Sequence, residues 1–205
     1  MSAPSDEGRS RPRARNLRGE GERLRGDLIA AVGRLLEEGS GEDDGPSLRA
    51  VARAAGVTPQ SVYLHFADKR ELVGALFEER FTELAEELTA AVRSAGDEPR
   101  ARLRALCMAY CSFAERSPGL YRVLFSNPTL PRQEPGRQRG MPALIVLDEA
   151  IRACMGEAPR QGPSSTTLCV WASMHGLVLL RRDRPNVSWP DLEGLVDEVL
   201  SAHVG

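Results

Sequence analysis

Short polar side chains gather between Thr58 and Tyr63, where they could contact a nucleic acid. Hydroxyl groups can bind phosphate oxygens, and a glutamine can form two hydrogen bonds to the edge of one base in the major groove of DNA. Gln60 is therefore the best candidate for reading a base, together with its neighbours Pro59 and Ser61. This stretch predicts a recognition surface for double-stranded DNA.

Two short helices must hold that surface. Ser47 is a plausible N-cap of a first helix, which contains Ala52 and stops at Gly56. Thr58 caps a second helix, and Pro59 takes its first position, where a missing N–H costs nothing. The small Ala52 lets the two helices approach closely, and Gly56 permits the left-handed turn between them. The spacing predicts a helix-turn-helix whose second helix is held outward.

A charged capping motif opens the next, longer helix. Asp68 and Glu71 stand at the spacing of a capping box, with Asp in place of the usual Ser or Thr. Lys69, the only lysine of the chain, lies in the first turn of this helix. Free backbone N–H groups there favour anions, so Lys69 is well placed beside a phosphate.

The stretch from Ser47 to Val73 resembles the DNA-binding signature of the TetR family. The residues that carry the resemblance are Ala52, Ala55-Gly56-Val57, Thr58, Tyr63, His65-Phe66, Lys69 and Leu72. The resemblance implies that Tyr63 and Lys69, with Ser47 and Thr58, hold the phosphate backbone. It also implies that the helix after Thr58 reads the bases.

Several residues near the motif leave alternatives open. Phe66 fits the core under the motif better than a DNA contact, and His65 suits packing and phosphate binding equally well. Pro59 and Gln60 stand where the family often has a basic residue and a glycine, so no target sequence can be transferred. An arginine-rich stretch before the motif could enter a minor groove, follow phosphates or remain a solvated arm. Its members are Arg9, Arg11, Arg13, Arg15, Arg18, Arg23 and Arg25.

The second half of the chain has apolar helical patterns with few polar tips. These patterns predict a pocket for a small apolar or aromatic molecule, oriented by one or two hydrogen bonds, although ordinary core packing explains each residue as well. His175, on an otherwise apolar helix, needs a hydrogen-bond partner, and Gly176 would let another helix approach closely. The candidate ligand contacts are Cys107, Tyr110, Cys111, Phe125, Trp171 and His175. Trp171 with His175-Gly176 also resembles a Trp…His-Gly subgroup of the TetR family.

A metal or redox site is the alternative for the two cysteines of that group. Cys107 and Cys111 lie at i, i+4 spacing and could join His175, but isolated cysteine pairs inside apolar stripes usually belong to the core. We expect no metal, no cofactor and no disulfide framework.

Composition and missing motifs exclude several classes of protein. The sequence has no Gly-rich phosphate loop, no nucleophile elbow and no paired carboxylates within an apolar pattern, so we do not expect an enzyme. A net charge of -2 argues against a protein that coats nucleic acid by charge alone. No apolar run is long enough to cross a bilayer and the first residues do not form a secretory signal, so we expect a cytoplasmic protein without a membrane partner.

The apolar periodicity indicates an all-α chain of about nine helices. We expect a flexible arginine-rich arm over 1–19, a three-helix DNA-binding domain over 20–68, and a helical bundle for ligand binding and dimerisation over 69–205. The helix around Trp171 and a last helix, capped by Ser188, carry broad apolar surfaces. A homodimer would cover these surfaces in a four-helix arrangement, as the resemblance also implies.

These features predict a sequence-specific, DNA-binding transcriptional regulator that acts on a pseudo-palindromic operator. We expect a repressor released by a small-molecule effector, because a ligand that shifts the long fourth helix would change the spacing of the two recognition helices. The alternative is a helical ligand-binding or protein-interaction module whose helix-turn-helix contacts a protein partner.

Overall fold

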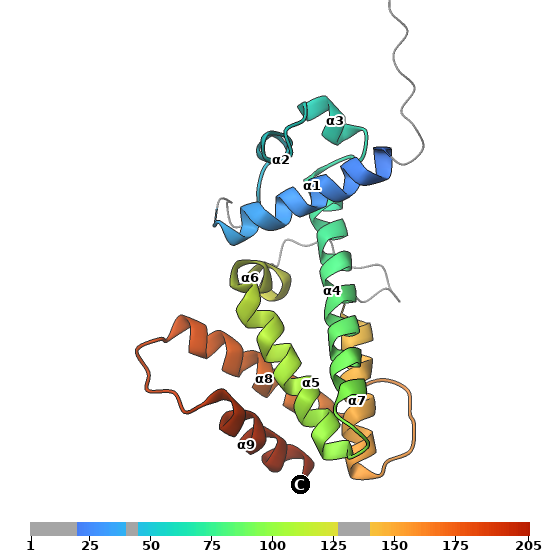
Figure 1. The fold of residues 1–205 in the computed structure, drawn as a ribbon, viewed down its shortest axis with the longest axis vertical. Coiled ribbons are helices and arrows are strands. Elements are labelled where there is room, and N and C mark those ends of the chain that lie inside the picture. Colours follow the sequence, from blue (N-terminus) through green and yellow to red (C-terminus); the bar gives the residue numbers. More distant parts are fainter. Residues whose placement is uncertain (1–19, 40–44, 127–139) are drawn as a thin grey trace, which may run out of the picture.

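The structure, a computed structural model, describes residues 20–39, 45–126 and 140–205 (Figure 1). Within these ranges it contains nine helices and no strand, which confirms the all-α prediction. The helices are α1 (Glu20–Glu37), α2 (Leu48–Ala54), α3 (Pro59–Tyr63), α4 (Lys69–Ser94), α5 (Pro99–Arg116), α6 (Pro118–Ser126), α7 (Met141–Met155), α8 (Ser165–Asp183) and α9 (Leu192–Val204). The predicted flexible arm, 1–19, lies outside the described residues.

Local capping explains where the two short helices begin. The Oγ of Ser47 accepts a hydrogen bond from a backbone N–H of α2 at 3.2 Å, and the Oγ1 of Thr58 does the same for α3 at 3.3 Å. Pro59 is the first residue of α3, and Gly56 takes the left-handed conformation with φ of 69°. The predicted caps and the glycine turn are therefore confirmed.

The start of α4 uses the predicted capping box with one difference. The carboxylate of Asp68 accepts from the backbone N–H of Glu71 at 2.9 Å. In return, Glu71 accepts from the N–H of Ala67 at 2.6 Å, one residue before the N-cap. Two N–H groups are thus satisfied at the point where the chain leaves the helix-turn-helix.

The first three helices bury apolar side chains against one another, at one end of the core that runs through the molecule. Phe66 is only 1% exposed and belongs to the buried cluster with Leu28, Val51 and Val62. The guanidinium of Arg25 lies 5.0 Å from the centre of the Phe66 ring. Phe66 is therefore a core residue, as its apolar character predicts.

The remaining helices form a bundle below this unit. Figure 1 shows α4 running from α1–α3 into the bundle, where it packs against α5 and α7, while α8 packs against α9.

A buried polar cluster joins α7 to the start of α8. The carboxylate of Asp148 accepts from Ser164 N–H at 2.9 Å, from the Thr167 hydroxyl at 2.6 Å and from Arg152 Nε at 2.8 Å.

Two predicted boundaries are wrong. Helix α9 begins at Leu192 with Asp191 as its N-cap, whose Oδ1 accepts from Gly194 N–H at 2.8 Å. Ser188 lies before the helix, in a segment that the Trp189 indole ties back to the end of α8 by a 3.0 Å hydrogen bond to a backbone carbonyl. The Pro/Gly/Arg-rich stretch from Asn127 to Pro142 predicts a loop, but Pro142 lies in the first turn of α7, where proline is well tolerated.

None of the helices in the described part of the chain is long and apolar enough to span a membrane.

Candidate functional site

The outer side of α3 is open to solvent. Thr58, Pro59 and Gln60 are exposed, Ser61 is half-buried, and Tyr63 is 58% exposed. The hydroxyl groups of Thr58 and Ser61 lie 2.9 Å apart. The opposite side of the helix is anchored by Val62, which is fully buried. The short helix therefore presents one continuous polar edge.

The other predicted DNA contacts surround α3. Ser47 is exposed at the start of α2, while Lys69 is half-buried in the first turn of α4. His65 is half-buried, and its ring packs close to Gly21 of α1. Packing is therefore the visible role of His65.

Sequence reasoning missed four exposed side chains on this end of the molecule. Arg49 and Arg53 are exposed on α2, and Arg70 is exposed at the start of α4. The i, i+4 spacing of Arg49 and Arg53, opposite buried Val51, is a signal that could have identified them. Leu64, at the end of α3, is 77% exposed. No acidic residue lies in the first turn of α2 or α3, so these two helix starts carry no opposing carboxylate.

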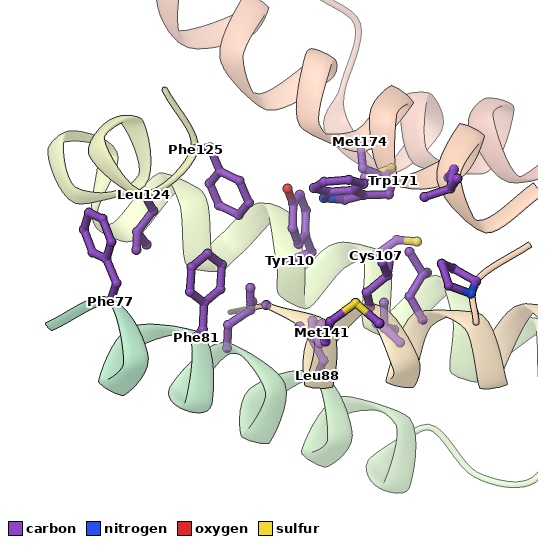
Figure 2. A pocket seen from close by; sticks show the side chains of 18 residues that line it. Phe77, Phe81, Leu88, Cys107, Tyr110, Leu124, Phe125, Met141, Trp171 and Met174 are labelled. Carbon is purple, nitrogen blue, oxygen red and sulfur yellow. The ribbon is translucent and has the colours of Figure 1, made fainter. Parts of the chain in front are cut away.

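A cavity of about 470 Å³ lies within the bundle (Figure 2). Its wall comes from α4, α5, α6, α7 and α8 and is almost entirely apolar. Among the predicted ligand contacts, it includes Cys107, Tyr110, Phe125 and Trp171. Cys111 is fully buried outside the wall, and His175 lies behind it.

Helix α4 contributes more of this wall than the sequence indicated. Phe77, Phe81, Leu84 and Leu88 recur along one stripe of α4 and all line the cavity. This stripe is indistinguishable from a core-packing stripe in the sequence, because both have the helical period. The long helix that starts at the helix-turn-helix is therefore also a cavity wall.

A chain of hydrogen bonds runs behind the cavity wall from α5 through α6 to α8. The hydroxyl groups of Tyr110 and Tyr121 are 2.6 Å apart, and the Tyr121 hydroxyl is 2.6 Å from Nδ1 of His175. The Tyr110 hydroxyl also lies 3.4 Å from the same nitrogen. The predicted need of His175 for a polar partner is thus met by two tyrosines.

Burial keeps these groups uncharged. It raises the pKa of Tyr110 to about 12, raises that of Tyr121 further, and lowers the pKa of His175, with Arg182 acting in the same direction. Each shift disfavours the charged form because the group has lost water. The hydrogen-bonded chain of Tyr110, Tyr121 and His175 is therefore made of neutral donors and acceptors near pH 7.

Cys107 and Cys111 are also neutral. Burial raises the pKa of Cys107 and of Cys111 to about 12, so neither is a thiolate near neutral pH. Within the described residues, no group of three or more His, Cys, Asp or Glu side chains could hold a metal ion.

The expectation that Gly176 admits a second helix is wrong for the helices of its own chain. No heavy atom of another part of the described chain lies within 4 Å of a Cβ built at this position. The side of α8 that carries Gly176 is therefore not in close contact with another of the described helices.

A close junction links α6 to the end of α1. The carboxylate of Glu37 accepts from the backbone N–H groups of Gly119 at 3.1 Å and Leu120 at 2.8 Å. A Cβ at Gly119 would lie 2.8 Å from the carbonyl oxygen of Leu36, so only glycine fits this approach. Since α6 also lines the cavity, it connects the cavity to the first helix (Figure 1).

An all-α chain with a helix-turn-helix at one end and a cavity in a separate helical bundle has the architecture of a two-part regulator. Comparison with protein families gives a specific assignment. The model for bacterial regulatory proteins of the tetR family matches residues 44–76, and the model for the tetracyclin repressor-like C-terminal domain matches residues 103–203. Together these stretches make up most of the chain, which belongs to the TetR family.

Two curated relatives match part of the chain. It is 32% identical over 117 residues to nucleoid occlusion factor SlmA of Marinobacter nauticus, covering 55% of this chain and 57% of that protein. It is 31% identical over 127 residues to the HTH-type transcriptional activator FasR of Mycolicibacterium smegmatis, covering 58% and 55%. The match thus spans little more than half the length of these relatives.

Solved structures share the fold over a longer range. A protein of unknown function from Rhodococcus sp. RHA1 has a TM-score of 0.71 at 26% identity, covering 96% of this chain and all of that one. The transcriptional regulator FadR of Bacillus subtilis, solved in complex with stearoyl-CoA, has a TM-score of 0.68 at 18% identity, covering 87% and 97%. The second likeness concerns the fold alone.

Proposed function

We propose that this chain is a sequence-specific, DNA-binding transcriptional regulator, and that a small apolar or aromatic ligand releases it from its operator. The observation that carries the proposal is the exposed polar edge of α3, held outward by buried Val62. Family membership supports it, since the family is one of bacterial regulatory proteins.

The roles of the DNA-contacting residues follow from their chemistry and exposure. Ser47, Thr58, Tyr63 and Lys69 contact phosphates, with His65 as a packing or phosphate residue. Gln60 contacts base edges in the major groove, together with Pro59 and Ser61 on the same helix. Phosphate contacts position the protein, and base contacts give it specificity.

The cavity is the effector site of this proposal. Cys107, Tyr110, Phe125 and Trp171 contact the ligand, with Cys111 and His175 supporting them from behind the wall. Helix α4 carries the change to the DNA-binding end, because it both lines the cavity and begins directly after the helix-turn-helix. A difference of about 1–3 kcal/mol between ligand affinities for the two states would change DNA affinity roughly five- to 150-fold.

The working form is a homodimer on a pseudo-palindromic operator, with residues 20–68 as the DNA-binding domain, 69–205 as the ligand-binding and dimerisation domain, and 1–19 as an arm. One helix-turn-helix contacts few base pairs, so specific binding needs two copies. Cys169, Ala172 and Leu180 support the choice of α8 as part of the interface, since all three are exposed apolar side chains on that helix. The cytoplasm is where such a dimer would meet its DNA.

DNA binding can be tested with the duplex that flanks the protein's own gene. Wild-type protein should bind it with an affinity that falls steeply as salt rises, because phosphate contacts release counterions. Gln60→Ala should lower the preference for this duplex over random DNA about ten-fold, whereas Gln161→Ala, an exposed glutamine before α8, should not.

A salt-independent affinity, or equal loss in both variants, would favour the alternative in which the helix-turn-helix contacts a protein partner. Light scattering on the same variants serves as a control, since the dimer should persist in each. TetR-family regulators are generally non-enzymatic, and we assign no reaction to the cavity.

A further inference from the structure

The hydrogen-bond chain behind the cavity wall restricts the polar group of the ligand. We infer that the cavity takes an uncharged, mainly apolar molecule with one hydroxyl group, which donates a hydrogen bond to the hydroxyl oxygen of Tyr110. This inference rests on the proposed function, in which the cavity is the effector site, and specifies the class of effector.

The wall is suited to a neutral molecule. Among the described residues that line the cavity, none carries a carboxylate, an ammonium, a guanidinium or an imidazole. Its two titratable groups, Cys107 and Tyr110, are both neutral at physiological pH, because burial raises each pKa to about 12. An ionised ligand group placed among these side chains would lose water without gaining an opposite charge, which is strongly unfavourable.

The protonation of His175 determines which group donates in each hydrogen bond of this chain. A neutral imidazole has one N–H group and one acceptor nitrogen, and Nδ1 of His175 lies 2.6 Å from the Tyr121 hydroxyl. When Nδ1 is the acceptor, Tyr121 donates to His175 and Tyr110 donates to Tyr121. Every hydroxyl proton of the chain is then used.

The opposite direction leaves one hydroxyl proton without an acceptor among the described residues. If Nδ1 of His175 carried the proton, Tyr121 would donate to Tyr110, and the Tyr110 proton would point into apolar surroundings without an acceptor. A buried donor without a partner is more costly than a lone pair without one. The first direction therefore prevails, and Tyr110 offers the cavity an oxygen acceptor.

That oxygen can still accept one hydrogen bond from a ligand. A phenolic oxygen has two acceptor lone pairs, and neither is used when the Tyr110 hydroxyl donates to Tyr121. Figure 2 shows the Tyr110 hydroxyl between the rings of Phe125 and Trp171, on the wall of the cavity. A ligand hydroxyl at this position would complete the hydrogen-bonded chain, whereas an ether or ketone could bind only if every hydrogen bond of that chain were reversed and the His175 proton moved to Nδ1.

The surrounding rings favour a flat, aromatic body. Phe81 and Phe125 meet edge to face with ring centres 5.6 Å apart, and both line the cavity. Aromatic rings pack well on such edges and faces. Two-ring aromatic compounds are therefore suitable probes.

The test compares three probes with the same ring system: 2-naphthol, 2-methoxynaphthalene and 2-naphthoate. Isothermal titration of the full-length protein at pH 7 should show 2-naphthol binding about five-fold more tightly than 2-methoxynaphthalene, and 2-naphthoate binding most weakly. Tyr110→Phe should abolish the difference between the first two probes. Ser112→Ala, which removes an exposed hydroxyl elsewhere on α5, should preserve it.

The probe series on the wild-type protein does not depend on how well the Tyr110 variant folds. Equal binding of 2-naphthol and 2-methoxynaphthalene, tightest binding of 2-naphthoate, or no binding of any probe would overturn the inference. DNA release is measured separately. If 2-naphthol binds in the expected order without releasing DNA, the ligand class stands and the proposed switch fails.

Discussion

Arg49 and Arg53 extend the DNA-facing surface beyond the residues that the sequence motif identifies. Both are exposed on α2, one helical turn apart, and they can meet phosphates beside the recognition helix. Replacing both with alanine should lower the slope of log affinity against log salt by about 0.9 for each phosphate that the variant no longer neutralises. A filter-binding series over several salt concentrations measures this slope.

Arg160→Ala is the matched control, since Arg160 is exposed in the loop before α8. An unchanged slope in the Arg49 and Arg53 variant would show that these side chains do not reach the DNA.

Asp148 carries a buried charge that contributes to stability. Burial alone would raise its pKa, but the hydrogen bonds from Thr167, Ser164 and Arg152 hold it below the usual value. A lowered pKa in the folded state stabilises the protein above the pKa of the unfolded state, about 3.9, and this contribution is lost as the pH falls through the folded pKa.

Asp148→Asn should therefore lower the free energy of unfolding by about 2–3 kcal/mol at pH 7, because the Arg152 charge stays buried without its partner. Urea unfolding at pH 7 and at pH 3 tests this. The difference between the two proteins should shrink at pH 3. A difference of the same size at both pH values would contradict the role of the carboxylate.

At the scale of helices, α6 is the element that the sequence described least well. Its apolar periodicity predicted a short helix, but not that Glu37 would hold its first turn or that Tyr121 would join His175. These contacts link residues far apart in the chain, and no local pattern encodes them. The helix starts at Ser47 and Thr58 were predictable, because a cap depends on residues within one turn.

Glu37 tests whether α6 takes part in the switch. Glu37→Gln removes the carboxylate that accepts from Gly119 and Leu120. A shift of α6 on ligand binding should then no longer move α1. We expect unchanged ligand affinity and a coupling between ligand and DNA reduced by about 0.5–2 kcal/mol. Fluorescence anisotropy of labelled DNA, with and without 2-naphthol, measures the coupling.

Glu38→Gln, an exposed neighbour at the same end of α1, is the control. Full coupling in the Glu37 variant would assign the signal to α4 alone.

At the scale of the whole molecule, the apolar outer surface of α8 is the basis for the proposed homodimer. Ala172→Glu together with Leu180→Glu would place two carboxylates at that interface, where their desolvation opposes association. Analytical ultracentrifugation should show a monomer. Ile145→Glu, an equally exposed apolar residue on α7, should leave a dimer.

If the dimer persists with both α8 changes, the interface lies elsewhere on the molecule.

The sequence predicts the helices and a pocket, but it does not distinguish that pocket from a filled core. Apolar periodicity identified the helices, and the residues from Ser47 to Leu72 identified the family of the DNA-binding end. Whether Cys107 or Trp171 faces open space or other side chains depends on how five helices pack together, and the same stripe serves either purpose. The empty space and the contribution of α4 therefore required three-dimensional information.

The most direct test of DNA recognition by α3 is repeated selection of bound duplexes from a pool of random sequence. Wild-type protein should enrich one pseudo-palindrome with two half-sites, and the variant with Gln60→Ala and Tyr63→Ala should enrich none while remaining dimeric. If the wild type enriches no sequence, or both proteins enrich the same one, the polar edge of α3 does not read DNA.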